Sequence, residues 1–490
     1  MDIAEHKQPV TRDFWQSLFA ADSIALIGAS SVVNSWGFNV MRQLLSSTKE
    51  LPDRHVYPIN PSASEILGTK AYGSILDVPN TVELAVIAVR ATKVPEILGE
   101  CLQKGVKAAL IISGGFAETG EVGAELESKI VEIARQGSLR FIGPNCIGHA
   151  NIHAKLGTAA MTDRLKPGTV ALLAQSGNLG ARITQMAASR GIGFSKFVST
   201  GNEASLHLED YLEYLADDVD TSVITAYIEG LREGRRFFQL AKEITTKKPI
   251  VVIKAGGTRE AKRAAISHTG ALTGSNEVYK AAFRQTGVIE TNDEDELCDV
   301  VAALLNQPLP PGDRIGILTM GGGLGVMATE ACEREGLKIA SLEQESLEKL
   351  DTVLPSRWSH GNPVDMAGIR PLANDTTILS CLKTLIEDKN VDVILSLVSP
   401  GVSIRYIAET LNDEEILALK ARNEEDMDML SEWAYEHRKP LFLVALIPQI
   451  DSEQAATPVG QRRIPEYPNP RRAARVMRHL FWYKQYIDGN

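Results

Sequence analysis

Residues 23–31 read S-I-A-L-I-G-A-S-S, residues 169–180 read T-V-A-L-L-A-Q-S-G-N-L-G, and residues 314–326 read R-I-G-I-L-T-M-G-G-G-L-G-V. Each stretch begins with a continuous apolar run, which is typical of a strand buried on both faces. Each then passes through small residues and glycines into a segment with helical spacing. A strand that feeds a helix through such a turn opens a doubly wound α/β unit. The three stretches therefore predict three α/β domains.

Further short runs rich in Val and Ile alternate with segments long enough for helices, which predicts parallel sheets covered on both faces. Pro and Gly cluster at residues 166–168 and 308–312, where the pattern starts again, and such clusters are typical of domain joints. We expect domains at residues 1–160, 161–306 and 307–490, each Rossmann- or flavodoxin-like. The runs of the first domain are Ile24–Gly28, Val56–Ile59, Leu84–Val89, Ala108–Ser113 and Phe141–Ile142.

Composition excludes several classes of protein. The chain has 490 residues, with 51 Lys and Arg against 62 Asp and Glu, so its formal charge is −11. This charge argues against nucleic acid or an anionic membrane as the main partner. No apolar run approaches the ~20 residues of a membrane span, and the polar first residues resemble no signal peptide. Five scattered cysteines without C-x-x-C spacing favour neither disulfides nor zinc, so we expect a cytoplasmic protein.

The glycine-rich turns are candidate anion sites, because a helix N-terminus offers backbone N–H groups and a partial positive charge. The alternative is that each turn only connects a strand to a helix. G-x-G-x-x-G is missing after the first strand, and the second strand ends at Asn60 rather than at an acid that would bind a ribose. G-x-x-x-x-G-K-[ST] is missing as well. We therefore expect phosphate groups other than those of NAD or P-loop ATP.

One of the nine histidines, His268, is the candidate for covalent chemistry. It lies in A-I-S-H-T-G-A-L-T-G, among small residues and glycines, after the basic residues Arg259, Lys262 and Arg263. A neutral imidazole in a basic loop is suited to accepting a phosphoryl group. Spacing alone favours the alternative, in which His268 is a loop residue that caps its neighbours. His149 and His153 form the only close histidine pair, and without nearby acids or cysteines we expect no metal site.

Seven motifs in chain order resemble the α subunit of NDP-forming acyl-CoA synthetases. This group is the ADP-forming acetate–CoA ligase branch of the succinyl-CoA synthetase superfamily, and the resemblance extends from about Ser23 to Tyr483. The motifs are G-A-S (28–30), Y-P-I-N-P (57–61), G-P-N-C-I-G (143–148), Q-S-G-N-L-G (175–180), S-T-G-N-E (199–203), S-H-T-G-A-L-T-G (267–274) and N-P-V-D (362–365).

The resemblance implies a ligase that interconverts acyl-CoA, phosphate and ADP with a free acid, CoA and ATP. It implies that His268 carries the phosphoryl group and that Glu229 orients this histidine, although spacing alone favours a surface glutamate. It also implies a CoA-binding first domain, a second domain with the phosphohistidine loop, and a flavodoxin-like third domain. Cys146 is expected to be a packing residue, because the family uses no cysteine nucleophile there.

The remaining site residues are carried over from the family motifs. For CoA they are Gly28, Ala29, Ser30, Ser31, Asn60, Ser62, Val89, Arg90, Ile112, Ser113, Gly114 and Asn145. For phosphate they are Ser176, Gly177, Asn178, Gly321, Gly322 and Gly323, where the last three alternatively serve strand–helix packing.

The residues after Tyr483 leave no room for the ATP-grasp module that the family needs. We therefore expect a β subunit that brings ADP or ATP with Mg²⁺, in a hetero-oligomer of the α₂β₂ type. The favoured acid is a small monocarboxylate such as acetate. The alternatives are a ligase for a larger or dicarboxylic acid and a non-catalytic module that senses CoA or acyl-CoA. A NAD-linked dehydrogenase fits poorly, because its fingerprint is missing.

Overall fold

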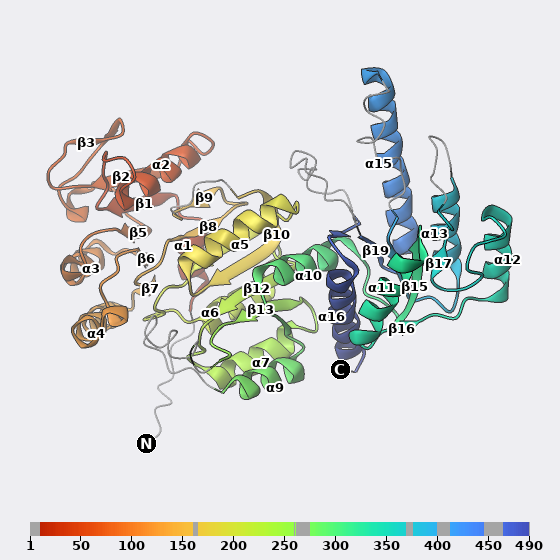
Figure 1. The fold of residues 1–490 in the computed structure, drawn as a ribbon. Coiled ribbons are helices and arrows are strands. Elements are labelled where there is room, and N and C mark those ends of the chain that lie inside the picture. Colours follow the sequence, from red (N-terminus) through yellow and green to blue (C-terminus); the bar gives the residue numbers. More distant parts are fainter. Residues whose placement is uncertain are drawn as a thin grey trace. The chain divides into compact units, whose positions relative to one another are not determined.

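The computed structural model describes residues 10–159, 165–258, 260, 275–368, 376–398, 412–444 and 464–489. The chain divides into two compact units, one of residues 1–188 and 192–294 and the other of residues 189–191 and 295–490. Three mainly parallel sheets with helical crossovers confirm the predicted α/β class (Figure 1). The domain boundaries near residues 160 and 306 stay predictions.

Sheet A lies in the first unit and has the strand order β2-β1-β5-β6-β7, with every pair parallel. Its central strands are buried except for the first residue of β1, as their continuous apolar sequences predict. The strands are β1 (Ser23–Ile27), β2 (His55–Ile59), β5 (Leu84–Ile87), β6 (Ala108–Ile111) and β7 (Arg140–Ile142). The helices are α1 (Arg12–Phe19), α2 (Trp36–Thr48), α3 (Val94–Lys104) and α4 (Glu121–Gln136), and β3 (Glu65–Ile66) and β4 (Thr69–Lys70) form a hairpin.

Sheet C, also in the first unit, has the order β14-β13-β12-β10-β11-β8-β9. The strands β8 and β9, which precede residue 160, pair antiparallel with this sheet rather than with sheet A. Figure 1 shows α5 on one face of the sheet and α7 and α9 on the other. The strands are β8 (His149–Asn151), β9 (Leu156–Gly157), β10 (Pro167–Ala174), β11 (Phe194–Ser199), β12 (Val223–Ile228), β13 (Ile250–Lys254) and β14 (Ile289–Thr291). The helices are α5 (Gly177–Ser189), α6 (Leu208–Asp217), α7 (Gly234–Ile244) and α9 (Asn276–Thr286).

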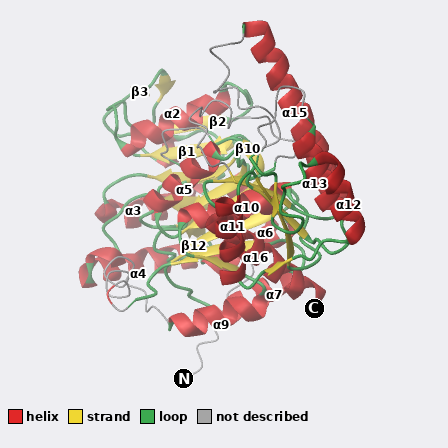
Figure 2. Ribbon diagram, turned by 45° about the vertical axis from the view of Figure 1, so that its right-hand side comes forward, coloured by secondary structure: helices red, strands yellow, loops and turns green. Residues whose placement is uncertain are grey.

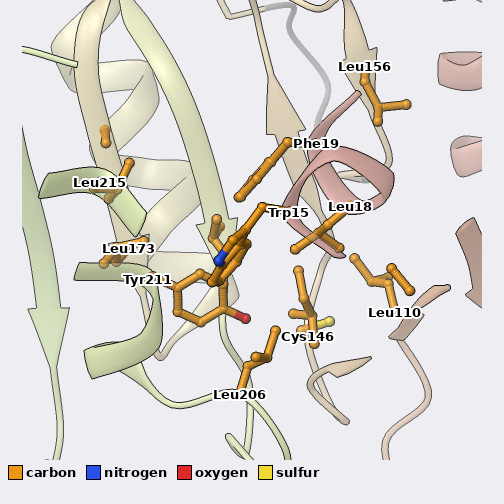
Figure 3. Close-up of a cluster of buried hydrophobic side chains, with 14 of the residues drawn as sticks. Trp15, Leu18, Phe19, Leu110, Cys146, Leu156, Leu173, Leu206, Tyr211 and Leu215 are labelled. Carbon is orange, nitrogen blue, oxygen red and sulfur yellow. The ribbon is translucent and has the colours of Figure 1, made fainter. Parts of the chain in front are cut away.

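The helix α1 joins the two sheets of the first unit into one hydrophobic core. Figure 3 shows Trp15 of α1 between Tyr211 and Leu173 on one side and Cys146 on the other. The Trp15 ring stacks on Tyr214 with a centroid separation of 4.7 Å. Because this core draws on residues before and after position 160, the chain folds here as one compact unit.

Sheet D lies in the second unit, with the order β16-β15-β18-β19-β20 and β17 beside β15. Figure 2 shows the helices in red around the yellow strands. The strands are β15 (Arg314–Thr319), β16 (Lys338–Ile339), β17 (Val364–Asp365), β18 (Val393–Ser396), β19 (Leu441–Val444) and β20 (Glu466–Tyr467). The helices are α10 (Glu294–Asn306), α11 (Gly322–Arg334), α12 (Gln344–Val353), α13 (Thr377–Glu387), α15 (Asp413–Glu436) and α16 (Pro470–Asp488). Among the described helices, none has the length and apolar character that crossing a membrane requires.

Candidate functional site

The turn after β1 is built from very close backbone contacts. Gly28 has a φ of +89°, and a Cβ atom there would lie 2.3 Å from the carbonyl oxygen of Ala88. The backbone of Gly37, in α2, packs just as closely against this turn, since a Cβ atom on Gly37 would lie 2.0 Å from the carbonyl oxygen of Gly28. The Asn60 side-chain amide donates to the Ala29 oxygen over 2.9 Å. These contacts require glycine at both positions, and they bring Gly28, Ala29 and Asn60 together at one edge of sheet A.

A loop separates this turn from its helix. Helix α2 begins only at Trp36, and Ser35 caps it by accepting a hydrogen bond from the Phe38 N–H over 3.2 Å. Ser30 Oγ accepts from the Val32 N–H over 3.0 Å. The predicted residues Ser31 and Ser62 are exposed at the same edge, and the Ser62 N–H donates to Asn60 Oδ1 over 2.8 Å.

The ends of β5, β6 and β7 complete this edge of sheet A. Ser113 Oγ donates to the Val89 oxygen over 2.6 Å, and the Asn145 N–H donates to the Ser113 oxygen over 2.9 Å. Ile112 is buried, whereas Arg90 and Gly114 are exposed. The structure thus gathers all twelve residues predicted for CoA along the carboxyl ends of the parallel strands, where open α/β sheets bind ligands.

The second predicted turn follows β10 in sheet C, and here the helix begins directly at Gly177. A Cβ atom on Gly177 would lie 2.4 Å from Ile147 Cγ2, so packing against the segment after β7 already requires glycine. Ser176 is half-buried and Asn178 is exposed. The N-terminus of α5 therefore opens at the carboxyl edge of sheet C.

Glu229 follows the last residue of β12, and its side chain is buried, contrary to the surface position that spacing favours. Because β12 pairs with β10, with Tyr227 opposite Ala174, Glu229 lies at the same edge as Ser176. The Tyr227 hydroxyl forms a hydrogen bond with Glu229, and burial together with this carboxylate raises the pKa of Tyr227 to about 12. Lys254 Nζ donates to the Glu229 carbonyl over 3.0 Å.

Three polar residues of this edge were not singled out from the sequence, although they lie inside quoted motifs. Gln175 precedes Ser176, and Asn202 and Glu203 belong to S-T-G-N-E. The Asn202 side-chain nitrogen donates to Glu118 Oε2 over 2.6 Å and to Glu127 Oε2 over 2.8 Å. The sequence pattern offers no signal for these roles, because the partners are distant along the chain: Glu118 and Glu127 are 84 and 75 residues from Asn202.

A groove of about 510 Å³ runs between α4 and the segment after β11. Its titratable lining residues are Glu127, Glu132, Arg135, Glu203, His207 and Arg232. Burial, with a contribution from Glu209, raises the pKa of Glu203 to about 7. Burial alone would also raise the pKa of Glu118, but the hydrogen bonds from Asn202 and three backbone N–H groups lower it.

In the second unit, the glycine run at the start of α11 has no packing explanation among the described residues. An added Cβ atom on Gly321 or Gly323 would meet no described atom within 4 Å, and on Gly322 only Asp365 Oδ2 at 3.5 Å. Among the described residues, the N-cap residue Gly321 makes no side-chain capping bond, and its own N–H donates to Thr319 Oγ1 over 3.3 Å. Asn362 of N-P-V-D instead holds strands together, donating to the Ile315 oxygen over 2.7 Å.

His268 lies outside the described residues, as do Arg259, Lys262 and Arg263. Cys146 is buried and donates to the Ile111 oxygen, and burial raises its thiol pKa to about 12, as expected of a packing residue. Across the described ranges, no cluster of three His, Cys, Asp or Glu side chains is arranged to hold a metal ion.

Comparison with known families matches both halves of the first unit. Residues 22–151 match the CoA binding domain, and residues 167–304 match the succinyl-CoA ligase like flavodoxin domain. The chain is 37% identical over 474 residues to the acetate–CoA ligase [ADP-forming] I subunit alpha of Pyrococcus furiosus, covering 96% of this chain and 98% of that protein. It is 42% identical to the corresponding II subunit alpha of the same organism, covering 82% and 88%.

Among solved structures, the chain resembles the dinucleotide forming acetyl-coenzyme A synthetase 1 of Ca. Korarchaeum cryptofilum, in complex with phosphate and ADP. The TM-score is 0.82 at 31% identity, and the match covers 97% of this chain and 98% of that one. The likeness therefore includes all three sheets.

Proposed function

The chain belongs to the family of the α subunits of ADP-forming acetate–CoA ligases, and from this premise we propose that it exchanges an acyl thioester for a phosphohistidine. A phosphate oxygen attacks the acyl-CoA carbonyl, the C–S bond breaks, and CoA leaves as a thiol. Nε2 of His268 then attacks the phosphorus of the acyl phosphate, and the carboxylate leaves. ADP finally takes the phosphoryl group, which regenerates the histidine.

The observation that carries this proposal is the buried Glu229 at the same edge as the N-terminus of α5. A carboxylate hydrogen-bonded to Nδ1–H of a histidine fixes the tautomer and leaves Nε2 as the nucleophile. In our proposal Glu229 does this for His268. Ser176, Gly177 and Asn178 at the helix start bind the phosphoryl oxygens, because free N–H groups and the helix dipole favour anions.

We assign CoA to the edge of sheet A, as a substrate. The Gly28 turn brings backbone within reach of a phosphate, because no side chain fits there. The exposed Arg90 adds positive charge at the same edge. The thioester end reaches Asn145, whose side chain is bonded to the second-domain residue Asn202.

Gly321, Gly322 and Gly323 are proposed to meet a phosphoryl group during the cycle. The support is steric, since the described residues leave open space around the Cβ positions of Gly321 and Gly323. Packing, which explains Gly177, does not explain this run.

The relatives are named as α subunits, which supports a partner β subunit for this chain. We propose an ATP-grasp β subunit in an α₂β₂ complex, where ADP and Mg²⁺ bind on the partner. Acetate is the favoured acid because both relatives are named for it. A larger or dicarboxylic acid is the alternative.

The test is incubation of the purified full-length chain with labelled phosphate and a panel of acetyl-, butyryl-, succinyl- and benzoyl-CoA. We expect acid-labile, base-stable label on the peptide that contains His268, fastest with acetyl-CoA. The His268→Asn variant should take no label, and Glu229→Gln should be slower by roughly 100-fold or more. CoA binding without label from any thioester, even with the β subunit present, would favour the sensing module instead.

A further inference from the structure

Gln175 connects the candidate catalytic edge to a carboxyl group buried behind it. Its side-chain oxygen accepts the backbone N–H groups of Glu229, over 2.5 Å, and of Gly230, over 3.0 Å. Its side-chain nitrogen donates to the Gly230 oxygen over 2.7 Å and to Glu203 Oε1 over 3.0 Å. One amide thus fixes the backbone that carries Glu229 and ties it to Glu203.

The orientation of this amide follows from its partners. Two N–H donors face one end of the Gln175 amide and two oxygen acceptors face the other, so the opposite orientation would oppose donor to donor and acceptor to acceptor. All four hydrogen bonds are buried. The Gln175 amide is therefore satisfied at both ends, and a buried amide with all of these partners is held in a single geometry.

Glu203 is itself held rigidly. It has a φ of +56°, a region that non-glycine residues rarely adopt. The residues on either side of it are anchored to the segment after β7, because the Asn202 N–H donates to the Pro144 oxygen over 2.9 Å and the Ala204 N–H donates to the Gly143 oxygen over 3.1 Å. Strained backbone that its surroundings hold in place is characteristic of functional sites.

We propose that Gln175 and Glu203 are positioning residues for the phosphoryl-transfer step, acting through the backbone of Glu229. Glu203 holds the Gln175 amide, and Gln175 places the end of β12 so that the Glu229 carboxylate meets the histidine at the right distance. This inference rests on the proposed function, since it assigns no chemistry of its own to either residue. Residues that orient metal-binding side chains in this indirect way typically contribute roughly 10- to 100-fold to activity, and we expect an effect of similar size here.

The experiment measures the single-turnover rate of phosphohistidine formation at pH 8, with acetyl-CoA and labelled phosphate, and measures CoA affinity in parallel. Gln175→Glu replaces the amide that donates to Glu203 and to the Gly230 oxygen with a second carboxyl group, whereas Gln175→Glu combined with Glu203→Gln restores one donor–acceptor pair in the reverse direction. Gln136→Glu, an exposed glutamine at the end of α4, is the matched control. We expect Gln175→Glu to slow labelling by roughly 10- to 100-fold while the CoA dissociation constant changes less than about twofold. The double variant should recover at least about fivefold.

The outcomes separate this inference from the proposed function. If the wild-type chain takes no label with any acyl-CoA, the proposed function fails. If the wild type is labelled and Gln175→Glu reacts as fast as the Gln136→Glu control, the positioning role is overturned. A double variant slower than Gln175→Glu would also overturn it, because additive losses mean that the two residues act separately. Unchanged CoA affinity and a native circular dichroism spectrum distinguish slow chemistry from misfolding. If Gln175→Glu does not fold, Glu203→Ala and Glu203→Gln replace it, and equal rates for these two would refute the role.

Discussion

The side-chain amide of Asn145, after the last strand of sheet A, donates to the side-chain oxygen of Asn202, after β11 of sheet C, over 3.2 Å. Asn202 then donates to Glu118 and Glu127 of the first domain. One residue therefore ties the proposed CoA edge to the proposed phosphate edge. Within the first unit, this contact and the shared hydrophobic core hold the two proposed edges together.

Asn202→Asp should destabilise the first unit at neutral pH. The substitution removes the side-chain N–H groups that donate to Glu118 and Glu127, and it places another carboxyl group beside these two. Both carboxylates are half-buried and keep backbone N–H donors, so we expect the lost hydrogen bonds to charged groups to lower the free energy of unfolding by about 1.5–3 kcal/mol in urea at pH 7.5. Asn202→Ala, which removes the donor without adding charge, should lose less. Equal stability of the Asp variant and the wild type would contradict this account.

His149 should make the fold less stable in mild acid. Its ring is buried between Thr158 Oγ1 and the Leu18 oxygen, and burial lowers its pKa to about 4. Between pH 6.5 and 4 the unfolded chain therefore binds a proton that the folded chain does not. The free energy of unfolding should fall by up to about 3 kcal/mol across this range. His149→Gln should flatten the pH dependence measured by urea unfolding, whereas the exposed control His55→Gln should leave it unchanged.

Glu203 should have the opposite effect at higher pH. Its pKa is raised to about 7 by burial, so between pH 4.5 and 7 the folded chain holds a proton that the unfolded chain releases. Its contribution to stability is therefore lost as the pH rises, by up to about 3 kcal/mol. Thermal unfolding of Glu203→Gln and of the wild type should differ more at pH 8 than at pH 5, in favour of the variant. An equal difference at both pH values would mean that Glu203 ionises normally.

Trp15 should matter far more for stability than Trp36. The Trp15 side chain is only 8% exposed and packs on Tyr214, whereas Trp36 is 48% exposed. Trp15→Ala should destabilise the first unit by about 3–5 kcal/mol, and Trp36→Ala by less than about 1 kcal/mol. Urea unfolding followed by circular dichroism measures both. A small loss in Trp15→Ala would mean that α1 does not hold the two sheets together.

Two glycines at helix starts should respond differently to alanine. Gly177→Ala forces a Cβ atom against Ile147 and should lower the melting temperature, and a second change, Ile147→Ala, should recover part of the loss. Gly323→Ala meets open space and should leave the melting temperature unchanged within about 1 °C. If phosphate approaches this helix start, Gly323→Ala will still slow transfer of label to ADP in the reconstituted complex. An unchanged transfer rate would contradict the proposal that a phosphoryl group approaches Gly323.

The strands of sheet A were readable from the sequence because continuous apolar runs have one stable environment, a sheet covered on both faces. Gly28 was readable for the same local reason, since its turn requires a residue without Cβ. The pairing of β8 and β9 with sheet C was not, because strand pairing depends on contacts distant along the chain. The burial of Glu229 could not be predicted from the pattern either. A glutamate after a strand is expected to be exposed, and only the neighbouring strands of the folded chain bury it.

The sequence by itself determined the α/β class, the three glycine-rich turns and the family, because these depend on residue periodicity, local backbone conformation and motif order. Only the tertiary structure decided that Gln175 binds the Glu229 backbone and that Asn202 joins two sheets. It also decided that close packing requires glycine at position 177, whereas the described neighbours of Gly323 leave room for a side chain. The physical reason is that a hydrogen bond or a steric contact is set by atoms in space. Gln175 and Glu229 are 54 positions apart and Asn202 and Glu118 are 84 apart, so no periodicity in the sequence indicates that they are in contact.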